Sequence, residues 1–78
     1  MRTIQVYSKS NCPYCVRAKN LLSGKGLEFE EINLDGRQEE LAALKARTGW
    51  MTVPQIFING ELIGGFQELA ALDAAGKL

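Results

Sequence analysis

Two cysteines, Cys12 and Cys15, are the only cysteines in this chain of 78 residues, and they lie in the run Cys-Pro-Tyr-Cys. An alternating apolar run over residues 3–8 ends shortly before them, and a helical pattern of apolar residues begins directly after them. Pro13 suits the first position of a helix, because it has no N–H to pair and its φ is already helical. The chain must therefore pass from a strand into a helix at the cysteine pair.

This junction favours Cys12 as an attacking thiol. Cys12 falls at or next to the N-cap of the predicted helix, where unpaired backbone N–H groups and the helix dipole stabilise a thiolate. Lys9 and Arg17 lie close in sequence and add positive potential. Cys15 is one turn further into the helix, where we expect a more covered and less acidic thiol. A low thiol pKa makes Cys12 a good leaving group, which suits a catalyst that must be released quickly from a mixed disulfide.

Two other uses of a Cys-x-x-Cys pair are disfavoured. Structural zinc needs four ligands, and the chain has no histidine and no further cysteine. A permanent disulfide across four residues would remove little entropy from the unfolded chain, and the N-terminus lacks the apolar stretch of a secretory signal. We therefore expect catalytic or redox use of the pair, with no bound metal.

Length and charge restrict the remaining possibilities. The chain is short enough to be a single domain, residues 1–78, and its 46% apolar and 23% charged content is ordinary for a globular protein. Nine basic and nine acidic residues cancel without any run of like charge, so we expect neither a nucleic-acid surface nor a membrane patch. No segment approaches membrane-spanning length, and we expect a monomer in the reducing cytoplasm.

Hydrophobic periodicity and turn residues predict seven elements. In chain order these are a strand over 3–8, a helix over 13–23, a strand over 27–33, a helix over 35–48, a strand over 55–58, a strand over 61–63 and a helix over 66–75. Asn59-Gly60 is the strongest hairpin signal. Two parallel strands joined through a helix, followed by an antiparallel hairpin, predict an α/β fold. It has a four-stranded mixed sheet with three helices on its two faces, in the order βαβαββα.

Local signals add detail to this prediction. The apolar alternation that begins at Leu27 shifts phase at Ile32, which indicates either a β-bulge or a wrong strand boundary. Asp35, with Gln38 three residues on, resembles a capping box for the second helix. Gly76 is the expected C-cap of the last helix.

Pro54 admits two interpretations. It can simply mark the start of a strand, since proline is allowed at that position. Alternatively, a cis Val53-Pro54 peptide would turn the backbone of Val53 toward the Cys12 end of the sheet, where its N–H and C=O could pair with an extended peptide. The sequence does not distinguish the two isomers.

Four segments carry a resemblance to a known family. They are Tyr-Ser-Lys (7–9), Cys-Pro-Tyr-Cys (12–15), Thr-Val-Pro-Gln-Ile-Phe-Ile-Asn-Gly (52–60) and Ile-Gly-Gly-Phe (63–66). In this order and spacing the chain resembles a dithiol glutaredoxin of the thioredoxin-fold superfamily. The resemblance implies a thioredoxin-like fold and reduction of protein disulfides and glutathione mixed disulfides, with glutathione as co-substrate. The implied partners are glutathione and disulfide-containing or glutathionylated proteins.

The same resemblance implies roles for individual residues. Cys12 would be the nucleophile that takes glutathione from the substrate, and Cys15 would resolve protein mixed disulfides. Lys9 would meet the glycine carboxylate of glutathione, and Tyr14 would flank its sulfur. Val53 would pair with the cysteinyl backbone, beside walls formed by Thr52 and Pro54, and the γ-glutamyl carboxylate would take the backbone N–H groups of Gly65, Phe66 and Gln67. A tripeptide with two carboxylates suits a lysine and a helix N-terminus.

Two positions depart from the family pattern. Many relatives have an aspartate where this chain has Gln67, so the contact to the γ-glutamyl ammonium must be neutral or pass to Glu68. Met51, next to Trp50, replaces a residue that is often basic, and makes the rim more apolar. We therefore expect weaker or altered glutathione recognition.

Other functions remain open at this point. Two chains that each supply Cys12, together with two glutathione thiolates, would hold a [2Fe–2S] cluster, although Pro13 and Tyr14 disfavour such a carrier. A glutaredoxin-like electron donor reduced by a thioredoxin reductase is a second alternative, against which Lys9, Tyr14 and the Thr-Val-Pro segment argue. A thioredoxin-fold module without catalysis would have an ordinary thiol pKa at Cys12.

Overall fold

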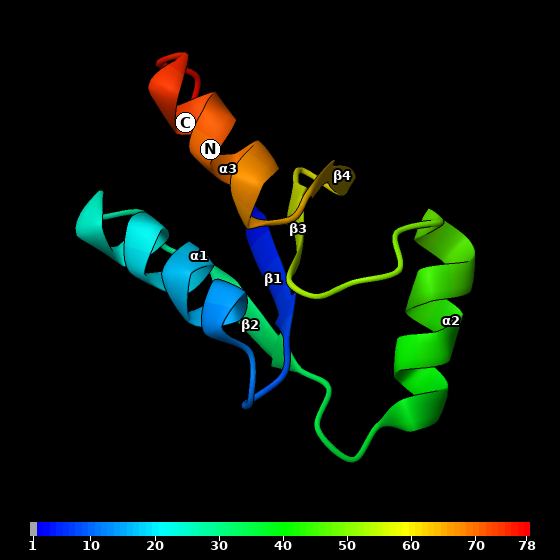
Figure 1. Ribbon diagram of the computed structural model, residues 1–78. Coiled ribbons are helices and arrows are strands. Elements are labelled where there is room, and N and C mark those ends of the chain that lie inside the picture. The colour runs from blue at the N-terminus through cyan, green and yellow to red at the C-terminus, as the bar shows by residue number, and fades with distance from the viewer. Residues whose placement is uncertain (1) are drawn as a thin grey trace.

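A computed structural model describes residues 2–78, in which seven helices and strands follow one another in the order predicted from the sequence (Figure 1). They are β1 (Ile4–Ser8), α1 (Pro13–Gly24), β2 (Glu30–Asn33), α2 (Gln38–Thr48), β3 (Gln55–Ile58), β4 (Glu61–Gly64) and α3 (Phe66–Ala74). The strands form one mixed sheet in the order β2-β1-β3-β4. The predicted βαβαββα fold is therefore confirmed.

The pairing of the two central strands determines where the cysteines lie. β1 is parallel to β2 and antiparallel to β3, and β3 is antiparallel to β4. Tyr7 near the end of β1 is opposite Gln55 at the start of β3. The loop that leaves β1 toward Cys12 and the loop that enters β3 through Val53 therefore lie at the same end of the two central strands.

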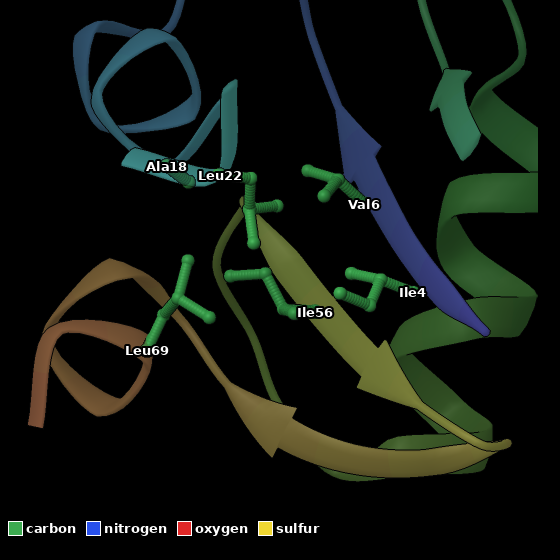
Figure 2. Packing of buried hydrophobic residues seen from close by; sticks show 6 residues of the cluster. All are labelled: Ile4, Val6, Ala18, Leu22, Ile56 and Leu69. Atoms are coloured by element: carbon green, nitrogen blue, oxygen red, sulfur yellow. The ribbon is translucent and has the colours of Figure 1, made fainter. Parts of the chain in front are cut away.

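Helices cover both faces of the sheet, with α1 and α3 on one face and α2 on the other (Figure 1). Between the sheet and α1 and α3 lies a cluster of buried side chains that point toward one another (Figure 2): Ile4, Val6, Ala18, Leu22, Ile56 and Leu69. A smaller cluster on the α2 face consists of Leu34, Leu44 and Phe57. Alternation within β1 and β3 supplies both clusters, because successive side chains of a strand point to opposite faces.

The second strand is shorter than predicted, since β2 begins at Glu30 and not at Leu27. Its pairing with β1 has no register shift, so there is no bulge at this point. Leu27 and Phe29 pack on the cluster beneath α1 and α3, whereas Ile32 packs on the α2 cluster. The phase shift in the sequence marks the place where burial passes from one face of the sheet to the other.

The predicted capping box of the second helix is wrong. Helix α2 begins at Gln38, its N-cap residue is Arg37, and no side chain caps it. A carboxylate oxygen of Asp35 instead accepts a hydrogen bond from the backbone N–H of Ser10, at 3.1 Å. Asp35 therefore connects the loop after β2 to the loop that carries the cysteines.

The remaining turn predictions are mostly confirmed. Asn59 and Gly60 have φ of 54° and 80°, as a two-residue type I′ hairpin requires. The C-cap of α3 is Ala75, one residue before the expected Gly76, which has a positive φ of 71°.

Within residues 2–78, no helix combines the length and apolar character needed to cross a bilayer.

We predict that Leu22→Ala lowers the free energy of unfolding by about 3 kcal/mol, because a truncated core leucine leaves a cavity. Leu22 is fully buried beneath α1. Val16→Ala on the same helix is the control, since Val16 is 46% exposed and its truncation should change stability by less than about 0.5 kcal/mol. Urea unfolding followed by far-UV circular dichroism measures both, and equal losses in the two variants would contradict the packing.

Candidate active site

The cysteine pair lies at the start of α1, where the sequence predicts it. Cys12 is the N-cap residue, with an extended backbone, and Pro13 is in the first turn. Cys12 and Cys15 are joined by a disulfide, and the Sγ of Cys12 accepts a hydrogen bond from the N–H of Cys15 at 3.1 Å. Cys15 is completely buried whereas Cys12 is partly exposed. An external thiol or disulfide can therefore reach only Cys12.

The loop between α2 and β3 faces Cys12. The carbonyl oxygen of Val53 lies 3.7 Å from the Sγ of Cys12. The Val53-Pro54 peptide is cis, the second of the two forms considered from the sequence, and Pro54 is buried. Backbone polar groups of this loop are thus available directly beside the reactive sulfur.

A buried network of side chains holds this loop. Gln55 is completely buried, its Nε2 donates to the carbonyl oxygen of Trp50 at 2.7 Å, and its Oε1 lies 3.0 Å from the hydroxyl oxygen of Thr48. That hydroxyl oxygen also accepts from the N–H of Trp50 at 3.1 Å. Gln55 is not among the residues for which the sequence predicts a role. The available signal was a polar residue at the head of a strand that is otherwise apolar.

A groove of about 370 Å³ lies beside Cys12 and is bounded by three parts of the chain. Its lining residues are Tyr14 from α1, then Trp50, Thr52, Val53 and Pro54 from the loop, and Gly65, Phe66, Gln67 and Glu68 from the start of α3. Seven of the eight residues expected to contact glutathione therefore come together. Lys9 does not line the groove, whereas Glu68, the alternative partner for the γ-glutamyl ammonium, does, as does Trp50, which was assigned no contact.

The N-terminus of α3 forms one end of the groove. The N-cap residue Gly65 has no side chain to accept hydrogen bonds from the first turn, and its own N–H donates to Oε1 of Glu68 at 2.9 Å. Within residues 2–78, the N–H groups of Phe66 and Gln67 have no hydrogen-bond acceptor. Of the three backbone donors expected from the sequence, that of Gly65 is thus occupied, and the other two are free at the positive end of a helix dipole.

In the described part of the chain, no basic side chain lines the groove, and Arg17 lies next to one of its lining residues. Glu68 is the only charged residue that lines it. The guanidinium of Arg17 stacks over the Tyr14 ring at 5.1 Å, and that ring lies 6.1 Å from the ring of Phe66. Lys9 is half-buried on the loop before Cys12. The lining residues therefore offer an anion inside the groove uncharged N–H donors and no cationic side chain.

Two carboxylates hold the loop that leads from β1 to Cys12. Hydrogen bonds from the side chain and backbone of Ser10, with the charge of Lys9, lower the pKa of Asp35. One oxygen of Glu31 accepts from the buried Ser8 hydroxyl at 2.6 Å and from Lys19 at 2.8 Å. The hydrogen bond from Lys19, followed by that from Ser8, lowers the pKa of Glu31. Glu31 thereby ties β1, β2 and α1 together just before the cysteine loop.

Comparison with known proteins gives consistent matches. The family model described as Glutaredoxin matches residues 4–63. Glutaredoxin 3 of Escherichia coli K12 is 49% identical over 78 residues, which cover all of this chain and 94% of that protein. The crystal structure of wheat glutaredoxin has a TM-score of 0.91 at 45% identity, covering 96% of this chain and 72% of that one. A buckwheat glutaredoxin–glutathione complex has a TM-score of 0.92 at 38% identity, covering 99% and 73%.

We predict that Glu31→Gln removes part of the loss of stability in acid. The folded-state pKa of Glu31 lies below its ordinary value of 4.5, so its carboxylate stabilises the fold above that pH. This stabilisation disappears as the pH falls through the folded-state pKa. Urea midpoints measured between neutral and acidic pH should fall less steeply in Glu31→Gln, and also in Lys19→Met. An unchanged slope in both variants would refute the assignment.

We predict that Gln55→Met lowers the free energy of unfolding by about 1 to 3 kcal/mol, because it leaves the partly buried Trp50 carbonyl without its donor. Thr48→Val removes the hydroxyl from the same network. If the network acts as one unit, the double variant should lose clearly less than the sum of the two single losses. Urea unfolding measures all three variants, and strict additivity would show that the loop is held by other contacts.

Proposed function

This chain belongs to the glutaredoxin family, and from that premise we propose that it reduces disulfides with glutathione as co-substrate and Cys12 as the nucleophile. One observation carries the proposal. Cys12 is the partly exposed N-cap residue of α1, and its sulfur accepts a hydrogen bond from the backbone N–H of Cys15, whereas the side chain of Cys15 is buried. The arrangement gives the two thiols different chemical roles.

The first role belongs to Cys12. When the disulfide opens, the N–H of Cys15 and the helix dipole face the Cys12 sulfur and favour its thiolate form. The thiolate attacks the glutathione sulfur of a protein–glutathione mixed disulfide, so that a Cys12–glutathione disulfide forms and a protein thiolate leaves. A second glutathione thiolate then attacks the glutathione sulfur, which yields oxidised glutathione and returns the Cys12 thiolate.

The second role belongs to Cys15 and concerns protein disulfides. Attack by Cys12 on such a disulfide gives a mixed disulfide between this chain and the client and releases one client thiolate. The Cys15 thiolate then attacks the Cys12 sulfur, which forms the intrachain disulfide seen here and releases the second client thiolate. Two glutathione molecules reduce the intrachain disulfide and leave as oxidised glutathione. Burial of Cys15 suits a group that reacts only within the chain.

The groove supports glutathione as the co-substrate. In our proposal the free N–H groups of Phe66 and Gln67 take the γ-glutamyl carboxylate, as a helix N-terminus takes an anion. The backbone of Val53, beside the Cys12 sulfur, pairs with the cysteinyl residue. Lys9 meets the glycine carboxylate outside the groove. The buckwheat relative in complex with glutathione supports this choice of ligand.

The rim of the site suits protein clients with apolar surroundings at their cysteine. Three large apolar side chains are exposed in the part of the chain that the structure covers, namely Tyr14, Val16 and Met51. Tyr14 and Val16 lie in the first turn and a half of α1, and Met51 lies between two residues that line the groove. We propose disulfide-containing or glutathionylated proteins as the clients.

The proposed function is tested by turnover of a glutathione mixed disulfide coupled to glutathione reductase, in the wild type, Cys12→Ser and Cys15→Ser. We expect no turnover in Cys12→Ser. Cys15→Ser should stay active on the mixed disulfide and lose activity on a protein disulfide, because only the second reaction needs the resolving thiol. Absence of glutathione-dependent turnover in the wild type would refute the proposal. Turnover supported by thioredoxin reductase alone would instead support the alternative of an electron donor that thioredoxin reductase reduces.

A further inference from the structure

We propose that Trp50 is a ligand-binding residue of this groove, and that its indole N–H donates to the carboxylate of the amino-acid head that binds at the start of α3. The inference rests on the proposed function and adds to it a specificity-determining contact. Of the two partners that the sequence leaves open for the ammonium of the same head, the inference takes Glu68. The α3 end of the groove thereby selects a ligand that carries a free α-amino acid group.

The first observation is an N–H without an acceptor. Trp50 lines the groove, and its Nε1 is the one buried side-chain nitrogen or oxygen within residues 2–78 that has no hydrogen-bond partner. Leaving a buried donor unpaired is destabilising, so native structures rarely do it without a reason. The backbone of Trp50 is held on both sides, by Thr48 and Gln55. The residue is therefore held in the wall of the groove by its backbone, and the donor of its indole is unused.

The second observation is the space beside that N–H. A Cβ built on Gly65 would lie 3.7 Å from Nε1 of Trp50, 3.5 Å from the carbonyl oxygen of Pro54 and 3.5 Å from Oε1 of Glu68. These are ordinary van der Waals distances, so the side of Gly65 that faces the three atoms is bare backbone, which a ligand can approach more closely than it could approach a residue with a side chain. Gly65 thus keeps open a position next to the indole N–H.

The polar groups around this position match an α-amino acid in both of its charges. The donors are the indole N–H and the free N–H groups of Phe66 and Gln67. The acceptors are the Pro54 carbonyl oxygen and the Glu68 carboxylate, of which one oxygen already holds the Gly65 N–H. A carboxylate and an ammonium on one carbon satisfy both sets together. A carboxylate alone would be repelled by Glu68, and an ammonium alone would leave the donors unpaired.

The most direct test observes the indole itself. Trp50 is the only tryptophan, so a ¹H–¹⁵N spectrum contains a single indole signal. On saturation with S-methylglutathione, which cannot react at sulfur, we expect the indole proton to move downfield as its hydrogen bond forms. The S-methyl derivative of 4-aminobutanoyl-cysteinyl-glycine, which lacks the α-carboxylate, should leave that proton in place while still shifting the backbone signal of Val53.

A kinetic test crosses variants with substrates. Trp50→Phe should raise KM for the glutathione mixed disulfide about tenfold with little change in kcat, because a hydrogen bond to a charged group is lost in the complex. This rise in KM should be absent when the substrate is the mixed disulfide that lacks the α-carboxylate. Glu68→Gln keeps an acceptor for the Gly65 N–H and should also raise KM for the glutathione mixed disulfide. That rise should be absent with the glutaryl analogue, which lacks the ammonium. Glu61→Gln on β4 is the control for loss of one negative charge and should leave KM unchanged.

Gly65→Ala provides a second variant in case Trp50→Phe does not fold. Its backbone φ of −98° is open to alanine, so the thermal midpoint should stay close to that of the wild type. The added Cβ would fill the position beside the indole, and KM should rise as in Trp50→Phe. An indole signal that stays fixed while Phe66 and Gln67 shift and turnover is normal would overturn the role of Trp50 alone. No turnover and no shifts in the wild type would refute the proposed function, and the role of Trp50 with it.

Discussion

The hydrogen bond from the N–H of Cys15 to the sulfur of Cys12 connects the chemistry of this protein to its fold. It exists because α1 begins at Cys12, and α1 begins there because Pro13 is already in a helical conformation and donates no hydrogen bond. Burial of Leu22 beneath the same helix fixes its direction against the sheet. The same geometry that leaves Cys12 reachable keeps Cys15 covered, so one helix start separates the proposed attacking thiol from the proposed resolving thiol.

The opposite wall depends on the central antiparallel pair of strands. Because the end of β1 lies beside the start of β3, the cysteine loop and the Val53 loop lie at the same end of the two central strands. The buried amide of Gln55 then holds the second loop through Trp50, so the wall that faces Cys12 is set by contacts inside the protein. The start of α3 completes the groove with two free N–H groups and one carboxylate. Three different parts of the chain are thereby brought together around the groove.

Local signals in the sequence predicted the elements that local chemistry determines. The hairpin at Asn59-Gly60 and the helix start at Cys12 follow from backbone preferences of single residues, and both are confirmed. The cap assigned to Asp35 failed because Ser10, distant in sequence, offers that carboxylate a different partner. The contacts of Trp50, Gln55 and Glu68 likewise depend on the packing of a loop against a helix start, which periodicity does not encode. The family resemblance named seven of the residues that line the groove and offered Glu68 as an alternative contact, but it assigned no contact to the indole of Trp50.

In the proposed mechanism, the N-cap position of Cys12 stabilises its thiolate. The most direct measurement is the rate of alkylation of Cys12 by iodoacetamide as a function of pH in Cys15→Ser, which keeps the backbone N–H at position 15 and leaves one thiol. We predict a midpoint well below the value of about 8.5 of an unperturbed cysteine. A midpoint at or above that value would show that the start of α1 does not activate the sulfur, and would contradict the mechanism derived from it.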